Sequence, residues 1–158
     1  MSVEAMTADQ VMSRLVVTVE PDESPLMAWE LMRRAGVHHL PVVDSSSCRL
    51  VGVLSREDLA AHWSGGPAEQ SQVPVARLLG ECSCAQVAPD TPISEVAAAM
   101  LDSGTVACVV GPDGTVIGLI TPTDLLRALA GRVTPGQGSA GVRGGMFHLE
   151  PVLPPRTP

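Results

Sequence analysis

The chain contains two copies of one pattern, and this internal repeat limits the folds open to it more than any other feature. Matching positions of the two copies lie 66 to 68 residues apart: Pro21-Asp22 with Pro89-Asp90, Gly36 with Gly104, and residues 52–59 with residues 118–125. The offset shortens where residues 44–49 give way to a tighter Pro112-Asp113-Gly114 turn. Matching anchors in the same order, with the length difference confined to a turn, indicate a duplicated folding unit.

The first helix of each copy is predicted from helical periodicity. Apolar residues recur at i, i+3, i+4 and i+7 in both copies: Ala28, Leu31, Met32 and Ala35, then Ile93, Val96, Ala97 and Met100. The start signals are a capping hydroxyl followed by a proline at the first helical position: Ser24-Pro25 and Thr91-Pro92. Gly36 and Gly104 stand where a left-handed residue ends a helix.

Short apolar segments rich in β-branched residues predict the strands. They are residues 40–43 and 50–54 in the first copy and residues 107–110 and 116–120 in the second. Shorter extended segments precede the first helices, at residues 16–19 and 86–88, and a second helix ends each copy, at residues 56–63 and 122–130. The order is strand, helix, strand, strand, helix, twice.

A unit of this size buries too little surface to be comfortably stable alone, whereas two units with matching apolar faces can close on each other. We therefore expect an α+β (α/β) fold of two tandem β-α-β-β-α repeats packed by pseudo-two-fold symmetry. The predicted organisation is repeat one at residues 6–64, a linker at 65–74, repeat two at 75–130 and a tail at 131–158. The tail holds six Gly and five Pro without a periodic pattern, which is typical of a disordered segment.

Charge and composition exclude several classes of function. Residues 1–130 carry seven Arg against sixteen acidic residues, a balance of −9, and aromatic residues make up 2% of the chain. A nucleic-acid surface needs a basic face and stacking rings, so we expect no nucleic-acid partner. No apolar run is long enough for a membrane helix, and the first ten residues do not resemble a signal peptide. The sequence predicts a cytoplasmic protein without a membrane partner.

Both repeats place a hydroxyl residue three positions before an aspartate at the start of the second helix. The pairs are Ser55 with Asp58 and Thr121 with Asp124. One interpretation is purely structural, because this spacing makes a capping box. The other is functional, because a helix N-terminus favours a phosphate and a nearby Asp can accept hydrogen bonds from the two hydroxyls of a ribose.

In its ordered motifs the sequence resembles the CBS domain, a regulatory module that occurs in tandem pairs and senses nucleotides. The resemblance covers roughly residues 6 to 130 and is carried by Val11-Met12, by residues 36–44 and by residues 50–59, together with their repeats. It implies a sensor that binds AMP, ADP, ATP or S-adenosylmethionine between the repeats and signals to a protein partner. It also implies a homodimer that associates through its helices.

The resemblance further implies roles for individual residues. Asp58 and Asp124 would hold the ribose, and the hydroxyls of Ser55 and Thr121 would meet phosphate. The adenine would be held by residues of repeat one, namely Thr18, Val37, His39, Leu40 and Pro41.

Repeat two departs from the family pattern, because it has no proline at the position equivalent to Pro41 and because Pro122 removes a backbone N–H from the helix start. Arg56 stands at the matching position in repeat one and carries a guanidinium suited to phosphate. We therefore expect a better site built with Ser55, Arg56 and Asp58, and a weaker or empty second one.

Other chemistry-bearing residues leave alternatives open. His38 and His39 are adjacent, so they should point to opposite faces, with one in the cleft. Cys82 and Cys84 favour a redox or metal sensor as one alternative, and a protein-interaction scaffold with vestigial pockets is another. The sequence shows no nucleophile with a base, no carboxylate dyad and no phosphate-binding loop, so we expect no enzyme, no required cofactor and no metal site.

Overall fold

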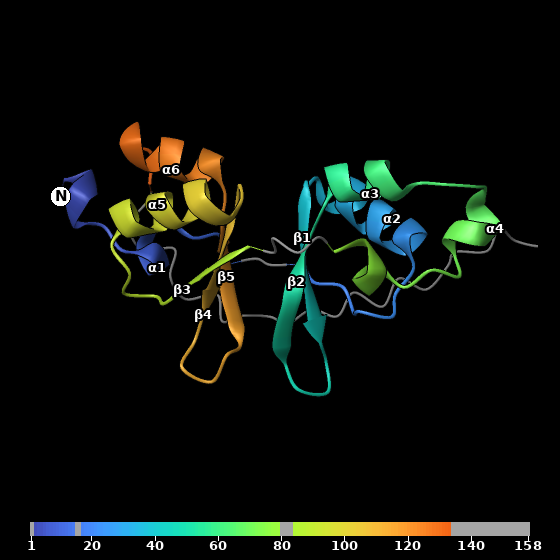
Figure 1. The fold of residues 1–158 in the computed structure, drawn as a ribbon. Helices are drawn as coiled ribbons and strands as arrows, with labels where there is room; N and C mark the ends of the chain where they lie inside the picture. The colour runs from blue at the N-terminus through green and yellow to red at the C-terminus, as the bar shows by residue number, and fades with distance from the viewer. Residues whose placement is uncertain (1, 15–16, 80–83, 134–158) are drawn as a thin grey trace, which may run out of the picture.

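The computed structural model describes residues 2–14, 17–79 and 84–133. Cys82, Val16 and the predicted tail from residue 134 onward lie outside the described residues. The described part forms two lobes, each with its helices packed against a small sheet (Figure 1). The mixed helix and strand content confirms the predicted α+β class.

Repeat one forms the elements expected from its sequence. They are α2 (Pro25–Ala35), β1 (His39–Asp44), β2 (Arg49–Ser55) and α3 (Arg56–His62). The Ser24 hydroxyl accepts a hydrogen bond from the Met27 backbone N–H, and Gly36 ends α2 in the left-handed conformation, as predicted. The two strands pair antiparallel, whereas the predicted strand at residues 16–19 is reduced to a single bridge between Val19 and Val42 in its described part.

Repeat two contains β3 (Ala85–Val87), α5 (Ile93–Ser103), β4 (Ala107–Val110), β5 (Val116–Ile120) and α6 (Pro122–Leu129). β3 pairs parallel with β4, which pairs antiparallel with β5. Both hairpins carry a register shift at equivalent places, after Val42 and after Val109, which matches the duplication.

Two predicted helix ends in repeat two are wrong in detail. Pro92 is the N-cap of α5 and not its first residue, so Thr91 does not cap the helix. Gly104 has φ 135° and ψ −178°, which is not the left-handed helical conformation of Gly36. This backbone region is nearly restricted to glycine, so the sequence signal was correct although the conformation differs.

The linker and the first residues of each repeat also have structure. Residues 65–74, predicted as a linker, contain α4 (Pro67–Gln70), and η2 (Val75–Leu78) follows. Buried Gln70 donates a side-chain hydrogen bond to the Ser64 carbonyl, which ties α4 to the end of repeat one. The N-terminal segment forms η1 (Val3–Ala5) and α1 (Ala8–Val11).

The first segment of each repeat packs on the core of the other repeat. Ala8, Val11 and Met12 belong to the core of repeat two, and Val75 and Leu78 belong to the core of repeat one. Figure 1 shows α1 beside α5 and α6 rather than beside α2.

The hydrogen bonds of this exchange are symmetric. The N–H groups of Ala8 and Asp9 donate to the carbonyls of Thr91 and Pro89, and those of Val75 and Ala76 donate to the carbonyls of Glu23 and Pro21. The exchange links the two repeats and follows the predicted pseudo-two-fold relation.

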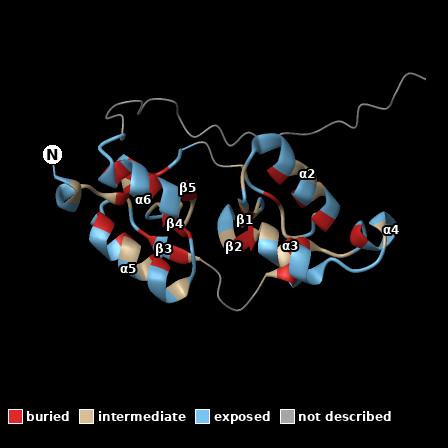
Figure 2. Ribbon diagram, turned by 90° about the horizontal axis from the view of Figure 1, so that it is seen from above, coloured by how far each residue is buried: buried red, intermediate tan, exposed pale blue. Residues whose placement is uncertain are grey.

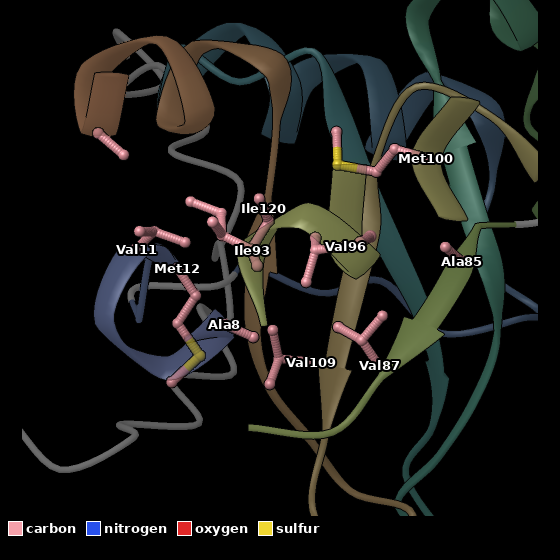
Figure 3. Close-up of a cluster of buried hydrophobic side chains, with 12 residues drawn as sticks. Ala8, Val11, Met12, Ala85, Val87, Ile93, Val96, Met100, Val109 and Ile120 are labelled. Atoms are coloured by element: carbon pink, nitrogen blue, oxygen red, sulfur yellow. The ribbon is translucent and has the colours of Figure 1, made fainter. Parts of the chain in front are cut away.

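The core is aliphatic and lies between helices and strands in each lobe, where Figure 2 shows the buried residues gathering. Met12, Val96 and Val109 converge in the core of repeat two (Figure 3). A third cluster joins the two repeats, where Val53 of β2 packs with Val106 and Cys108. Burying these side chains is the main favourable term that holds the lobes together.

Candidate functional site

Both predicted capping boxes are present at the starts of α3 and α6. The Asp58 carboxylate accepts hydrogen bonds from the Ser55 backbone N–H (2.9 Å) and hydroxyl (2.8 Å). The Asp124 carboxylate accepts the same two bonds from Thr121, at 2.9 Å and 3.0 Å. The two aspartates therefore play the same structural role in their helices, and only their surroundings distinguish them.

A cavity of about 470 Å³ lies between the two repeats and reaches Asp124 but not Asp58. Its lining comes from the first segment of repeat one, from the α2–β1 junction, and from the β5–α6 junction of repeat two. The lining residues are Ser13, Val17, Gly36, Val37, His38, His39, Pro41, Leu119, Thr121, Pro122, Thr123, Asp124 and Arg127. This volume is within the range of small-molecule sites in proteins.

The bridge between Ser13 and Leu119 closes one side of the cavity. Each of these residues donates its backbone N–H to the carbonyl of the other, at 2.9 Å and 3.1 Å. This bridge joins the chain of repeat one to β5, shortly before the start of α6. The exchange of N-terminal segments is thus what brings the two repeats together around one cavity.

Asp124 is the most heavily bonded side chain of the cavity. It is 6% exposed, and one carboxylate oxygen, Oδ2, accepts both bonds from Thr121. The other oxygen, Oδ1, faces Arg127 Nη1 at 3.3 Å and the Ser13 hydroxyl at 3.5 Å. Both Oδ1 contacts are long, so this oxygen can exchange them for stronger donors from a ligand.

Both histidines line the cavity, which corrects the expectation that only one would do so. His38 is exposed and His39 is half-buried. Burial lowers the pKa of His39 below its usual value of 6.5, because the imidazolium loses hydration there. His39 therefore presents a neutral ring to the cavity near pH 7.

The structure groups the other predicted residues differently from the sequence analysis. Val37, His39 and Pro41 share the cavity with Thr121 and Asp124, whereas five predicted residues are absent from its lining: Thr18, Leu40, Ser55, Arg56 and Asp58. Leu40 is fully buried in the core of repeat one, and Thr18 is exposed elsewhere.

Arg56 packs against an aromatic ring in the structure, and its predicted role toward a phosphate stays a prediction. Its guanidinium carbon lies 5.7 Å from the centre of the Trp29 ring, a cation–π contact between α3 and α2. Ser55, Arg56 and Asp58 do not line this cavity, so the better site expected at the start of α3 stays a prediction. They lie outside the cavity because the crossing of the chain sets repeat one's α2–β1 junction against the α6 start of repeat two.

Sequence analysis missed Ser13, Val17 and Arg127 in the cavity. Ser13 follows Val11-Met12 and Val17 lies in the extended segment at residues 16–19, but the contact of Ser13 with Leu119 is long-range and no local pattern indicates it. The position of Arg127 could have been predicted from the sequence, because it follows Asp124 by three residues and therefore lies on the same face of the helix.

Within the described ranges, no group of three or more His, Cys, Asp or Glu side chains is arranged to hold a metal ion. Among the same residues, no helix combines the length and the apolar character that crossing a membrane requires.

The sequence matches the CBS domain family twice, over residues 8–65 and 82–131. A relative from Methanocaldococcus jannaschii, the uncharacterized protein MJ1404, is 32% identical over 123 residues, which make up 77% of this chain and 27% of that protein. The chain thus spans about a quarter of the length of this relative.

Solved structures share the fold. An acetoin utilization protein (AcuB) from Vibrio cholerae has a TM-score of 0.68 and 24% identity, over 80% of this chain and 91% of that one. The CBS domain pair of MJ0100, solved with 5′-methylthioadenosine and S-adenosyl-L-methionine, has a TM-score of 0.66 and 22% identity, over 81% and 98%. The CBS domain of a bacterial CNNM/CorC family Mg²⁺ transporter, solved with ATP, has a TM-score of 0.70 and 20% identity, over 83% and 92%. Both repeats match the family and both fold in its manner, so the chain belongs to the CBS domain family.

Proposed function

We propose that this chain is a regulatory module, not an enzyme, and that it binds an adenosine-containing ligand in the cavity between its repeats. The observation that carries the proposal is the cavity itself, which joins Val37 and Pro41 of repeat one to Thr121 and Asp124 of repeat two. A ligand there touches both halves of the molecule. It can therefore shift any equilibrium between arrangements of the repeats that it binds with different affinity.

The lining offers each part of such a ligand a partner. Val37, Pro41 and Leu119 supply apolar contacts for an adenine ring. The Oδ1 atom of Asp124 accepts from ribose hydroxyls once the long contacts to Arg127 and Ser13 are released. Arg127, then free of Asp124, is placed to meet a phosphate.

The ligands of two structural neighbours support the same class of compound. One was solved with 5′-methylthioadenosine and S-adenosyl-L-methionine and another with ATP. All three contain adenosine and differ in what is attached to the ribose. Adenosine is therefore the shared part that we assign to this cavity, and the attached group is the part left open to experiment.

A homodimer is the second element of the proposal. Three leucines on the outer helices are strongly exposed: Leu101 on α5 (89%), and Leu126 (63%) and Leu129 (68%) on α6. Figure 1 shows α5 and α6 on the same side of the molecule as α2 and α3. A second copy would cover these side chains. Light scattering of the native chain and of a Leu126→Glu/Leu129→Glu variant should show a dimer and a monomer, and a monomeric native chain would contradict the assignment.

Thermal-shift measurements with AMP, ADP, ATP and S-adenosylmethionine test the ligand proposal. A ligand at 100 times its Kd should stabilise the folded chain by roughly 2.7 kcal/mol, which raises the melting temperature by several degrees. No rise with any of these compounds up to millimolar concentration would overturn the proposal. That result would favour an interaction scaffold in which the cavity has no ligand.

A further inference from the structure

Two cysteines meet at the place where the repeats join. Cys108 lies in β4 and is fully buried, and Cys84, immediately before β3, is partly buried. The parallel register pairs Ala85 with Ala107, so Cys84 is one step outside the ladder and diagonal to Cys108. Both side chains belong to the cluster that Val53 of repeat one completes.

The two side chains pack in the same cluster, and their surroundings make the two thiols unequal. Hydrogen bonding to the side chain and backbone of Cys108 lowers the pKa of the Cys84 thiol. The hydrogen bond to Cys84, together with burial, raises the pKa of the Cys108 thiol. Cys84 is also the more exposed of the two cysteines, so a peroxide reaches its sulfur first and Cys84 reacts as the nucleophile.

We propose that Cys84 and Cys108 form a site of reversible oxidation, in which a hydroperoxide converts the two thiols to an intramolecular disulfide. The Cys84 thiolate attacks the peroxide oxygen, the O–O bond breaks, and the leaving alkoxide or hydroxide takes a proton to give an alcohol or water. The resulting sulfenic acid is attacked by the Cys108 sulfur, and the S–S bond forms as a second oxygen leaves as water. Two thiols are oxidised by two electrons, which the peroxide accepts.

The local backbone suits this reaction. Cys84 precedes the first paired residue of β3, so its position can adjust without breaking the ladder between β3 and β4. That freedom matters because a disulfide requires its Cα atoms to lie within about 7 Å. The site is also close to the cavity, because Leu119 packs against the same cluster and lines the cavity as well.

The experiment uses the full chain as a Cys48→Ser/Cys82→Ser variant, which retains only the two cysteines in question. The variant is oxidised with hydrogen peroxide, the remaining thiols are alkylated, and the intact mass is measured after denaturation. We expect the loss of two hydrogen atoms, no alkylation, and full reversal by dithiothreitol. Asp90, Glu95 and Asp102 lie between the cysteines, so cleavage at acidic residues should release two peptides joined by a disulfide.

Two single variants in the same background test the order of events. In Cys108→Ala, a sulfenic-acid probe such as dimedone should label Cys84, whereas in Cys84→Ala it should label Cys108 severalfold less. Circular dichroism checks that each variant is folded. The proposal would be overturned if both thiols could still be alkylated after the peroxide treatment. A disulfide that forms only between two chains would overturn it as well. Equal labelling of the two cysteines would overturn the assigned order of attack.

Discussion

Replacing Asp124 by Asn should abolish most of the ligand affinity while it leaves the helix start largely intact. Asn keeps an oxygen that can accept the two hydrogen bonds from Thr121, at 2.9 Å and 3.0 Å, so α6 stays capped. The substitution removes the negative charge near the helix N-terminus. This loss should lower the free energy of unfolding by about 0.3–1 kcal/mol. The stability loss should therefore be small.

The loss of ligand affinity should be larger, because the second oxygen of Asp124 faces the cavity. A hydrogen bond to a buried charged group contributes about 1.5–3 kcal/mol. Losing one such bond to a ribose hydroxyl raises Kd roughly 10- to 150-fold. Isothermal titration calorimetry with AMP, or with whichever adenosine compound stabilises the chain best, measures this change directly.

Asp58→Asn is the matched control. Asp58 makes the same two bonds to Ser55, at 2.9 Å and 2.8 Å, but does not line the cavity. The two variants should lose similar stability in urea denaturation, and only Asp124→Asn should lose the affinity for the ligand. Equal loss of affinity in both variants, or none in Asp124→Asn, would refute the assignment of the ribose to Asp124.

Three further predictions test other parts of the structure. Arg127→Ala should weaken AMP two- to fivefold, as expected for a partly exposed ion pair, and should leave adenosine unchanged in the same calorimetric titration. Gly118→Ala should lower the free energy of unfolding by about 1–3 kcal/mol in urea denaturation, because a methyl group there would overlap the buried Met12 side chain. Adding Met12→Ala should recover part of this loss, and a Gly118→Ala chain of native stability would contradict the close packing of α1 on β5. Because the folded chain lowers the pKa of His39, the unfolded chain takes up that proton first, so the free energy of unfolding should fall between about pH 7.5 and 5.5. His39→Gln should flatten this decline, and an unchanged pH profile would argue against the buried neutral ring.

The architecture was largely predictable because local signals and the duplication agree. Strands β4 and β5 begin and end at the predicted residues. Ser24 caps the start of α2 and Gly36 caps its end, as their residue types require. Periodicity and capping depend on neighbours within a few residues, so the sequence displays them directly. The misplaced start at Pro92 shows the limit of such signals, because a proline suits both the N-cap and the first helical turn.

The composition of the site was only partly predictable. Five of the predicted residues share the cavity, but the better site was expected at Asp58 and the cavity reaches Asp124. The cause is a long-range crossing: Ser13 pairs with Leu119, and α1 packs in the core of repeat two. The local sequence around Ser13 and Met12 does not indicate that contact, because the contact depends on the way the two lobes pack against each other.

Photoaffinity labelling with 8-azido-AMP tests the central claim most directly, because it reports where an adenosine ligand lies. The label should fall on the α2–β1 junction at residues 36–41 and on residues 119–127 of repeat two, and excess AMP should suppress it at both places. Protected labelling confined to one repeat, or located away from these segments, would contradict a ligand site built jointly by the two repeats.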